Sequence, residues 1–195
     1  QKDVNALLIA HLPKLSLAPG SRIFVPLCGK SHDIGWLLSK GHAVAGAELS
    51  AMAIEQLFAD LDISPTRTKL GPLERFSGPN LDIYVGDIFD LTAAQLGPVS
   101  AVFDRAALVA LPDQMRLRYA RHLTALTETA PQLLITFDYD QSAMEGPPFS
   151  VQAQDVANLY GDPYTLTCQE KVPVLGGLKG HCPATEVAWT LTPKP

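Results

Sequence analysis

Four short apolar segments of this 195-residue chain are each followed closely by a glycine or a charged residue. The segments and their residues are 22–26 with Gly29, 43–47 with Glu48, 81–85 with Asp87, and 101–103 with Arg105. A glycine-bearing turn lets the backbone approach a ligand, and an acid that closes the next segment accepts hydrogen bonds from both hydroxyls of a ribose. The pattern therefore indicates a site for a nucleoside.

The phosphate-binding patterns are incomplete in this region. A dinucleotide site has the pattern Gly-x-Gly-x-x-Gly, but here Gly29 is the sole glycine of the turn. A P-loop begins with a glycine five positions before its second one, and Phe24 stands at that position. A nucleoside without phosphates remains, and S-adenosylmethionine is the usual one on a fold of this kind.

Each of these residues also has a purely structural interpretation. Glu48 is then an exposed residue before a helix, Asp87 a loop cap, and Arg105 the ion-pair partner of Asp104. Cys28 gains reactivity if it lies at a helix N-terminus, but a buried structural thiol is the favoured interpretation. The placement of the charged residues after successive segments favours a common site.

The elements that position these residues alternate between strand and helix patterns. Predicted strands lie at 22–26, 43–47, 81–85, 101–103, 133–137, 164–171 and 186–191, and predicted helices at 4–12, 34–38, 50–61, 119–126 and 155–160. Such alternation is typical of a parallel sheet covered by helices on both faces. The connection between the last two strands is too short for a crossover helix, so we expect them to pair antiparallel at one edge.

Composition and charge limit the class of protein. The chain has a net charge of −5 and is 47% hydrophobic, which suits one globular domain spanning residues 1–195. This acidic balance gives no reason to expect nucleic acid, and no apolar run is long enough to span a membrane. Three scattered cysteines and no visible signal peptide predict a cytoplasmic location. Among the histidines and cysteines, His181-Cys182 is the one adjacent pair, so we expect no metal site.

Several longer strings resemble the thiopurine S-methyltransferase family. They are Val25-Pro26-Leu27-Cys28-Gly29-Lys30-Ser31 with Asp33, Glu48-Leu49-Ser50, Gly86-Asp87-Ile88-Phe89, Phe103-Asp104-Arg105-Ala106-Ala107-Leu108, and Gly146-Pro147-Pro148-Phe149-Ser150. The resemblance runs from near the N-terminus to about Tyr160. It implies an α/β, Rossmann-like, doubly wound sheet of about seven strands, mostly parallel with an antiparallel edge strand and with helices on both faces.

The same resemblance implies a cofactor and a set of residues that hold it. The cofactor is S-adenosylmethionine, and the predicted binding residues are Leu27, Gly29, Glu48, Leu49, Asp87, Ile88 and Arg105. By this analogy Asp87 and Ile88 lie beside the adenine, while Arg105 also faces the acceptor. Family members carry an N-terminal tryptophan-containing segment over the cofactor, which would precede Gln1. The chain also departs from the family between Lys171 and Pro195, where it has no arginine.

The expected activity is methyl transfer to a small-molecule thiol, with the protein acting as a monomer. Methyl transfer from a sulfonium is an in-line displacement, and a soft thiolate of low pKa needs alignment and exclusion of water more than a base. Arg105 would favour the thiolate electrostatically. Three alternatives stay open: other soft acceptors (halide, selenium or tellurium species), a cofactor-binding module without turnover, and a nucleotide-dependent oxidoreductase, against which the glycine pattern counts.

Overall fold

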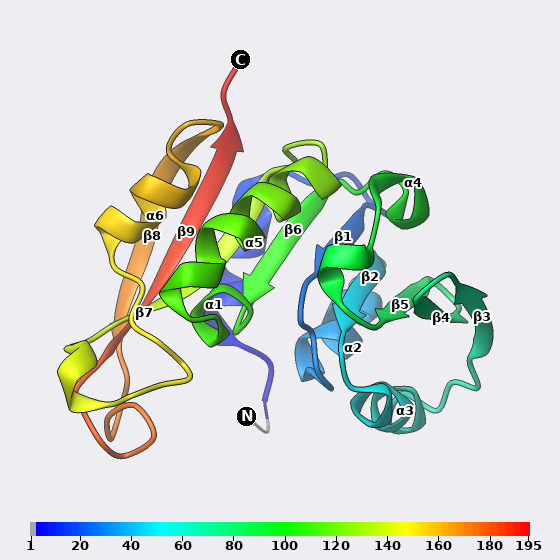
Figure 1. The fold of residues 1–195 in the computed structure, drawn as a ribbon, viewed down its shortest axis with the longest axis horizontal. Coiled ribbons are helices and arrows are strands. Elements are labelled where there is room, and N and C mark those ends of the chain that lie inside the picture. Colours follow the sequence, from blue (N-terminus) through cyan, green and yellow to red (C-terminus); the bar gives the residue numbers. More distant parts are fainter. Residues whose placement is uncertain (1–2) are drawn as a thin grey trace.

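A computed structural model describes residues 3–195, in which one sheet of nine strands forms the centre of the fold (Figure 1). The strand order is β3-β4-β5-β2-β1-β6-β7-β9-β8. The strands are β1 (Arg22–Val25), β2 (Ala43–Glu48), β3 (Thr66–Leu70), β4 (Leu73–Gly78), β5 (Leu81–Val85), β6 (Ala101–Arg105), β7 (Gln132–Asp138), β8 (Tyr164–Pro173) and β9 (Thr185–Pro193).

The middle of the sheet is parallel and both edges are antiparallel. Strands β5, β2, β1, β6 and β7 pair in parallel, whereas β3, β4 and β5 pair antiparallel at one side and β7, β9 and β8 at the other. The chain runs outward from β1 through β2 in one direction and through β6 in the other, so the switch point lies between β1 and β6. The predicted mixed sheet and its β8–β9 pairing are confirmed.

The predicted count of about seven strands is wrong for the described chain, residues 3–195, which has nine. The additional pair is the hairpin of β3 and β4, joined by Gly71, where φ is +64°. Strand β3 lies at the edge and is exposed along most of its length. Its sequence, Thr66–Leu70, therefore lacks the apolar pattern by which buried strands are found.

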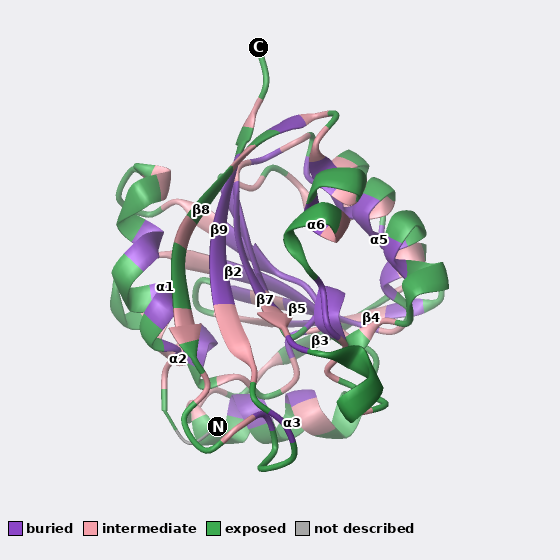
Figure 2. Ribbon diagram, turned by 90° about the vertical axis from the view of Figure 1, so that its left-hand side faces the viewer, coloured by how far each residue is buried: buried purple, intermediate pink, exposed green. Residues whose placement is uncertain are grey.

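Two helix layers cover the sheet, as Figure 2 shows. The helices are α1 (Ala6–His11), α2 (His32–Ser39), α3 (Ala51–Asp60), α4 (Ala93–Leu96), α5 (Asp113–Leu126) and α6 (Ala153–Tyr160), with 3-10 helices η1 (Leu12–Leu15), η2 (Ile88–Asp90), η3 (Leu108–Ala110) and η4 (Gln141–Ala143). Ile23 and Val25 pack in the core with α1, α2 and α3, while Phe24 packs in the core with α4, α5 and α6. This alternation buries both faces of β1.

Serine side chains begin the two helices that flank the predicted site. Ser31 accepts a hydrogen bond from the N–H of Asp33 at the start of α2, and Ser50 accepts one from Ala53 at the start of α3. The helix predicted over 50–61 is confirmed as α3, with Ser50 as its N-cap. Within residues 3–195 we find no helix that combines the length and the apolar character needed to cross a membrane.

Candidate active site

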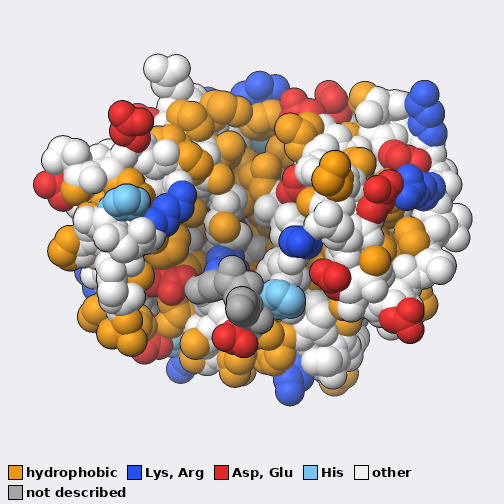
Figure 3. All heavy atoms as spheres, turned by 90° about the horizontal axis from the view of Figure 1, so that it is seen from below, with side chains coloured by type: hydrophobic (Ala, Val, Ile, Leu, Met, Phe, Trp, Pro, Cys, Tyr) orange, Lys and Arg blue, Asp and Glu red, His pale blue; other side chains and the backbone are white. Residues whose placement is uncertain are grey.

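A cavity of about 260 Å³ lies at the edge of the sheet where β1, β2 and β5 end. Figure 3 views the molecule from this edge and shows a hollow among hydrophobic side chains with charged groups around it. The residues that line the cavity are Leu27, Ala47, Glu48, Leu49, Gly86, Asp87, Ile88, Phe89, Leu111, Met115, Arg118 and Tyr119. The structure thus brings together five of the residues predicted from the sequence: Leu27, Glu48, Leu49, Asp87 and Ile88.

The turn after β1 is shaped by positive φ angles and a close approach to β2. Leu27 and Gly29 have φ angles of 46° and 52°, and the N–H of Cys28 donates to the carbonyl of Ala47 at 3.0 Å. A Cβ at Gly46 would lie 2.9 Å from the sulfur of Cys28. The thiol of Cys28 is buried, and burial raises its pKa far above the usual range, with the charge of Glu48 as a second cause. The expectation of a buried structural thiol is confirmed.

Glu48 is the carboxylate at the centre of the site. Its Oε2 accepts a hydrogen bond from the N–H of Gly29 at 3.0 Å, and its Oε1 accepts one from the N–H of Ser50 at 2.9 Å. Each carboxylate oxygen has two lone pairs, so one on each oxygen remains beyond these bonds. Two fixed acceptors on the wall of a cavity match the two adjacent hydroxyls of a ribose.

The turn after β5 is bonded to the end of β2. The N–H of Gly86 donates to the carbonyl of Glu48 at 2.9 Å. The carboxylate of Asp87 accepts from the N–H of Phe89 at 3.0 Å, so it caps η2 and lines the cavity at the same time. Ile88 is buried, and its carbonyl lies 2.8 Å from Nε2 of His122. The acidic side chain of Asp87 and the apolar side chain of Ile88 therefore lie side by side on one wall of the cavity.

Helix α5 supplies a wall that the sequence analysis missed. Met115, Arg118 and Tyr119 line the cavity from this helix, and the guanidinium carbon of Arg118 lies 3.7 Å from the ring centroid of Phe89. Their spacing of three and four positions places these side chains on one helix face. The helix predicted from the apolar pattern covers only 119–126, whereas α5 begins at Asp113, so Met115 and Arg118 lie before the predicted helix.

Arg105 lies at the end of β6 and does not line this cavity. Its Nη1 donates to Oδ2 of Asp33 at 3.1 Å. The sequence analysis also considered an ion pair between Arg105 and Asp104, and that interpretation is wrong. The buried Asp104 instead accepts hydrogen bonds from the hydroxyl of Tyr119 at 2.7 Å and from the N–H of Leu108 at 3.1 Å. Burial raises the pKa of Asp104 to about 6, although both hydrogen bonds oppose that shift.

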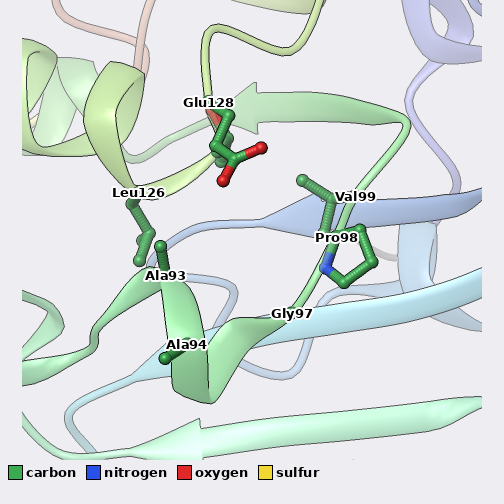
Figure 4. A pocket seen from close by; sticks show the side chains of 8 residues that line it. Ala93, Ala94, Gly97, Pro98, Val99, Leu126 and Glu128 are labelled. Carbon is green, nitrogen blue, oxygen red and sulfur yellow. The ribbon is translucent and has the colours of Figure 1, made fainter.

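A second pocket, of about 490 Å³, lies between α4, the segment before β6 and the end of α5 (Figure 4). Ala93, Pro98, Val99, Leu126 and Glu128 are among its residues. It lies toward the edge where the parallel strands begin, and its lining contains none of the predicted residues. Across residues 3–195, no three His, Cys, Asp or Glu side chains are grouped so that they could hold a metal ion.

Comparison with known proteins identifies the family. The family model described as thiopurine S-methyltransferase matches residues 1–188. The chain belongs to the thiopurine S-methyltransferase family. A relative of that name from Xanthobacter autotrophicus is 58% identical over 187 residues, covering 96% of this chain and 88% of the relative. Another, from Gluconobacter oxydans, is 48% identical over 195 residues, covering 100% of this chain and 89% of the relative.

Solved structures with low sequence identity share the fold. A SAM-dependent methyltransferase from Methanosarcina mazei superposes with a TM-score of 0.66 at 13% identity, covering 98% of this chain and 100% of that one. An N1-methyltransferase from Burkholderia thailandensis, with bound S-adenosylhomocysteine, gives a TM-score of 0.61 at 15% identity, covering 96% and 76%.

Membership of the thiopurine S-methyltransferase family confirms the predicted fold class and enzyme class. The chain is a methyltransferase that depends on S-adenosylmethionine. This finding favours an enzyme over the cofactor-binding module without turnover and over the oxidoreductase.

Proposed function

We propose that this enzyme methylates the sulfur of small aromatic or heterocyclic thiols, thiopurines among them, with S-adenosylmethionine held in the 260 Å³ cavity. The observation that carries the proposal is the carboxylate of Glu48, which two backbone N–H groups fix on the cavity wall at the ends of three parallel strands. A carboxylate held in this way can accept hydrogen bonds from both hydroxyls of a ribose, so the ligand needs no phosphate group for binding.

The side chains of the cavity divide into a polar set and an apolar set. Glu48 accepts from the ribose hydroxyls, and Leu27, Gly29 and Leu49 surround it on the turns after β1 and β2. Asp87 and Ile88 border the adenine from the turn after β5. When bound, S-adenosylmethionine supplies an electrophilic methyl group on a sulfonium.

Arg105 is the proposed acceptor residue. Its guanidinium, one-fifth exposed at the end of β6, carries a permanent positive charge that stabilises a thiolate relative to the neutral thiol. Heteroaromatic thiols ionise readily, so the site needs little base assistance. Apolar residues at the cavity, such as Leu111 and Met115, exclude water from the reacting sulfur.

A calorimetric titration of S-adenosylhomocysteine, the product form of the cofactor, tests the role of Glu48. Replacing Glu48 with Ala removes both ribose acceptors and should weaken binding by about 1.5–3 kcal/mol, the scale of hydrogen bonds to a charged group. Glu55→Ala is the matched control, because Glu55 is exposed on α3 and pairs with Arg67, away from the cavity lining. Unchanged affinity in a folded Glu48→Ala variant would contradict the assignment.

An acceptor panel tests the substrate class. The wild-type enzyme should transfer methyl groups to aromatic thiols faster than to halide, selenium or tellurium species at equal concentrations. A preference for one of those species would overturn the thiol assignment while leaving the cofactor site intact.

The setting of the enzyme is also part of the proposal. We propose a cytoplasmic monomer of one domain that needs neither nucleic acid nor a membrane. Its cysteines support a reducing compartment, since Cys28, Cys168 and Cys182 form no disulfide in the described residues.

A further inference from the structure

Asp33 is a buried carboxylate in the first turn of α2. Only 1% of the residue is exposed, and a charge at such a depth is costly unless it is paired and hydrogen-bonded. Its Oδ1 accepts from the backbone N–H of Asn5 at 2.8 Å. Its Oδ2 accepts from the hydroxyl of Ser31 at 3.0 Å and from Nη1 of Arg105 at 3.1 Å. The carboxylate is therefore fixed by three different parts of the chain.

The contact with Asp33 is what holds the guanidinium of Arg105. Among residues 3–195, the guanidinium of Arg105 donates a hydrogen bond to no other acceptor. A guanidinium has five N–H donors, and this one is one-fifth exposed at the edge where the site opens. One side of the group is thus bound to the protein while its other donors remain for a ligand.

Asp104, the acid next to Arg105 in the sequence, does not compete for this guanidinium. Both of its oxygens are already bonded, to the hydroxyl of Tyr119 and the N–H of Leu108. Asp104 is bonded to α5 in the core, and the partner of Arg105 comes instead from the first turn of α2.

We propose that Asp33 is the positioning residue of Arg105, and that it holds the guanidinium in the orientation that receives the acceptor thiolate. The inference rests on the proposed function of Arg105. An arginine side chain has many rotamers, and fixing one of them before the acceptor arrives removes an ordering cost from the reaction. Because Asn5 is the N-cap of α1, the same carboxylate also joins α1 to this arrangement.

The first experiment measures turnover and cofactor affinity of Asp33→Asn, which keeps the shape and removes the charge. We expect kcat/KM for an aromatic thiol to fall about 10- to 100-fold, the scale of a misplaced catalytic group, mainly through kcat. The Kd of S-adenosylhomocysteine should change less than about threefold, because Asp33 does not line the cavity. Wild-type kcat/KM in the variant would overturn the proposal.

Asp82→Asn is a matched control. Asp82 also pairs with an arginine and a serine, accepting from Nη2 of Arg22 at 3.0 Å and from the hydroxyl of Ser77 at 2.7 Å. This pair lies where β1 and β5 begin, away from the site. Asp82→Asn should lower stability and leave kcat/KM unchanged. A loss equal to that of Asp33→Asn would mean that any broken Arg–Asp pair reduces turnover, and would overturn the proposal.

A double-mutant cycle separates positioning from a general structural role. In an Arg105→Gln background, adding Asp33→Asn should reduce kcat/KM less than about twofold, since Asp33 acts through Arg105. Equal losses in both backgrounds would show that Asp33 acts independently and would overturn the proposal. If the single Asp33→Asn variant fails to fold, comparing Arg105→Gln with the double variant still tests the proposal, because the double variant leaves no buried charge of this pair without its partner. A further loss of kcat/KM greater than about twofold would then overturn the proposal.

A readout without turnover distinguishes failure of this inference from failure of the proposed function. If the wild-type enzyme binds S-adenosylhomocysteine but methylates no thiol, the proposed function fails. The side-chain ¹⁵N NMR signal of Arg105, assigned by its loss in Arg105→Gln, then tests the positioning alone. We expect an ordered signal in the wild type and a mobile one in Asp33→Asn. An equally ordered signal in both would overturn the proposal.

Discussion

Glu48, Asp33 and Asp104 are carboxylates close to the switch point, and each is held in a different way. Glu48 is bound by backbone N–H groups at the cavity, Asp33 by Arg105, and Asp104 by Tyr119 and Leu108 in the core. The environments differ accordingly: the proposed roles are a ligand contact for Glu48 and a positioning contact for Asp33, and the bonds of Asp104 lie within the core. Burial raises the pKa of Asp104, and this shift has a measurable consequence for stability.

The stability of the protein should depend on pH through Asp104. Burial raises its pKa from 3.8 to about 6, so the folded state binds this proton more tightly than the unfolded chain. The contribution of Asp104 to stability is then complete below about pH 4 and is lost as the pH rises through 6, by about 3 kcal/mol. Urea unfolding of the wild type and Asp104→Asn at pH 4 and pH 7 measures it.

The difference in unfolding free energy, wild type minus Asp104→Asn, is the quantity to compare, since other carboxylates titrate in both proteins. It should fall as the pH rises from 4 to 7. A constant difference would show that Asp104 ionises in the folded state as it does in the unfolded chain.

At the scale of elements, the hairpin of β3 and β4 supports the turn that carries Asp87. Strand β4 pairs with β5, and Gly86 follows β5 directly. Gly86 has a φ angle of 138°, and a Cβ there would lie 2.5 Å from Cδ2 of the buried Leu73 on β4. The edge hairpin thus limits which residue the turn accepts and fixes one wall of the cavity.

Gly86→Ala should destabilise the protein by about 1–3 kcal/mol, the cost of one residue in a sparsely populated backbone conformation, and should weaken cofactor binding. Gly71→Ala is the control, because Gly71 also has a positive φ, 64°, but a Cβ there meets nothing within 4 Å. Thermal unfolding and titration of S-adenosylhomocysteine measure both effects. Equal losses in the two variants would show that the contact with Leu73 has no influence.

At the scale of the whole molecule, one continuous sheet joins the two helix layers. Hydrophobic cores lie on both faces of that sheet, and the cavity opens at a single edge of it (Figure 3). Because both helix layers pack on the same sheet, loss of either layer would expose a core face of that sheet. This supports the prediction that residues 1–195 form one domain.

Scanning calorimetry should therefore give one cooperative transition. S-adenosylhomocysteine at about one hundred times its Kd should raise the Tm by roughly 5–10 °C, because a ligand of the folded state adds about 2.7 kcal/mol at that concentration. The shift should shrink in Glu48→Ala. Sedimentation should show one species of 21.0 kDa. Two separate transitions, or a dimer, would contradict the prediction of a monomeric single domain.

The sequence by itself determined where the strands end and which residues stand there. Local spacing encodes strands and turns, and parallel strands of this fold place their carboxyl ends along one edge. Glu48 and Asp87 could therefore be assigned to one site from positions along the chain, and the longer strings around them indicated the family. The count of strands failed at the hairpin of β3 and β4, whose edge strand β3 is exposed and does not need the apolar pattern that reveals a buried strand.

The tertiary structure alone decided which side chains meet. Arg105 pairs with Asp33, 72 positions away, and not with the adjacent Asp104. Arg118 reaches the cavity because α5 packs beside the turn after β5. Such pairings depend on how helices and strands pack and on which buried charge lacks another partner. No local pattern encodes these distances, so the partner of Arg105, the proposed acceptor residue, emerged only from the folded chain.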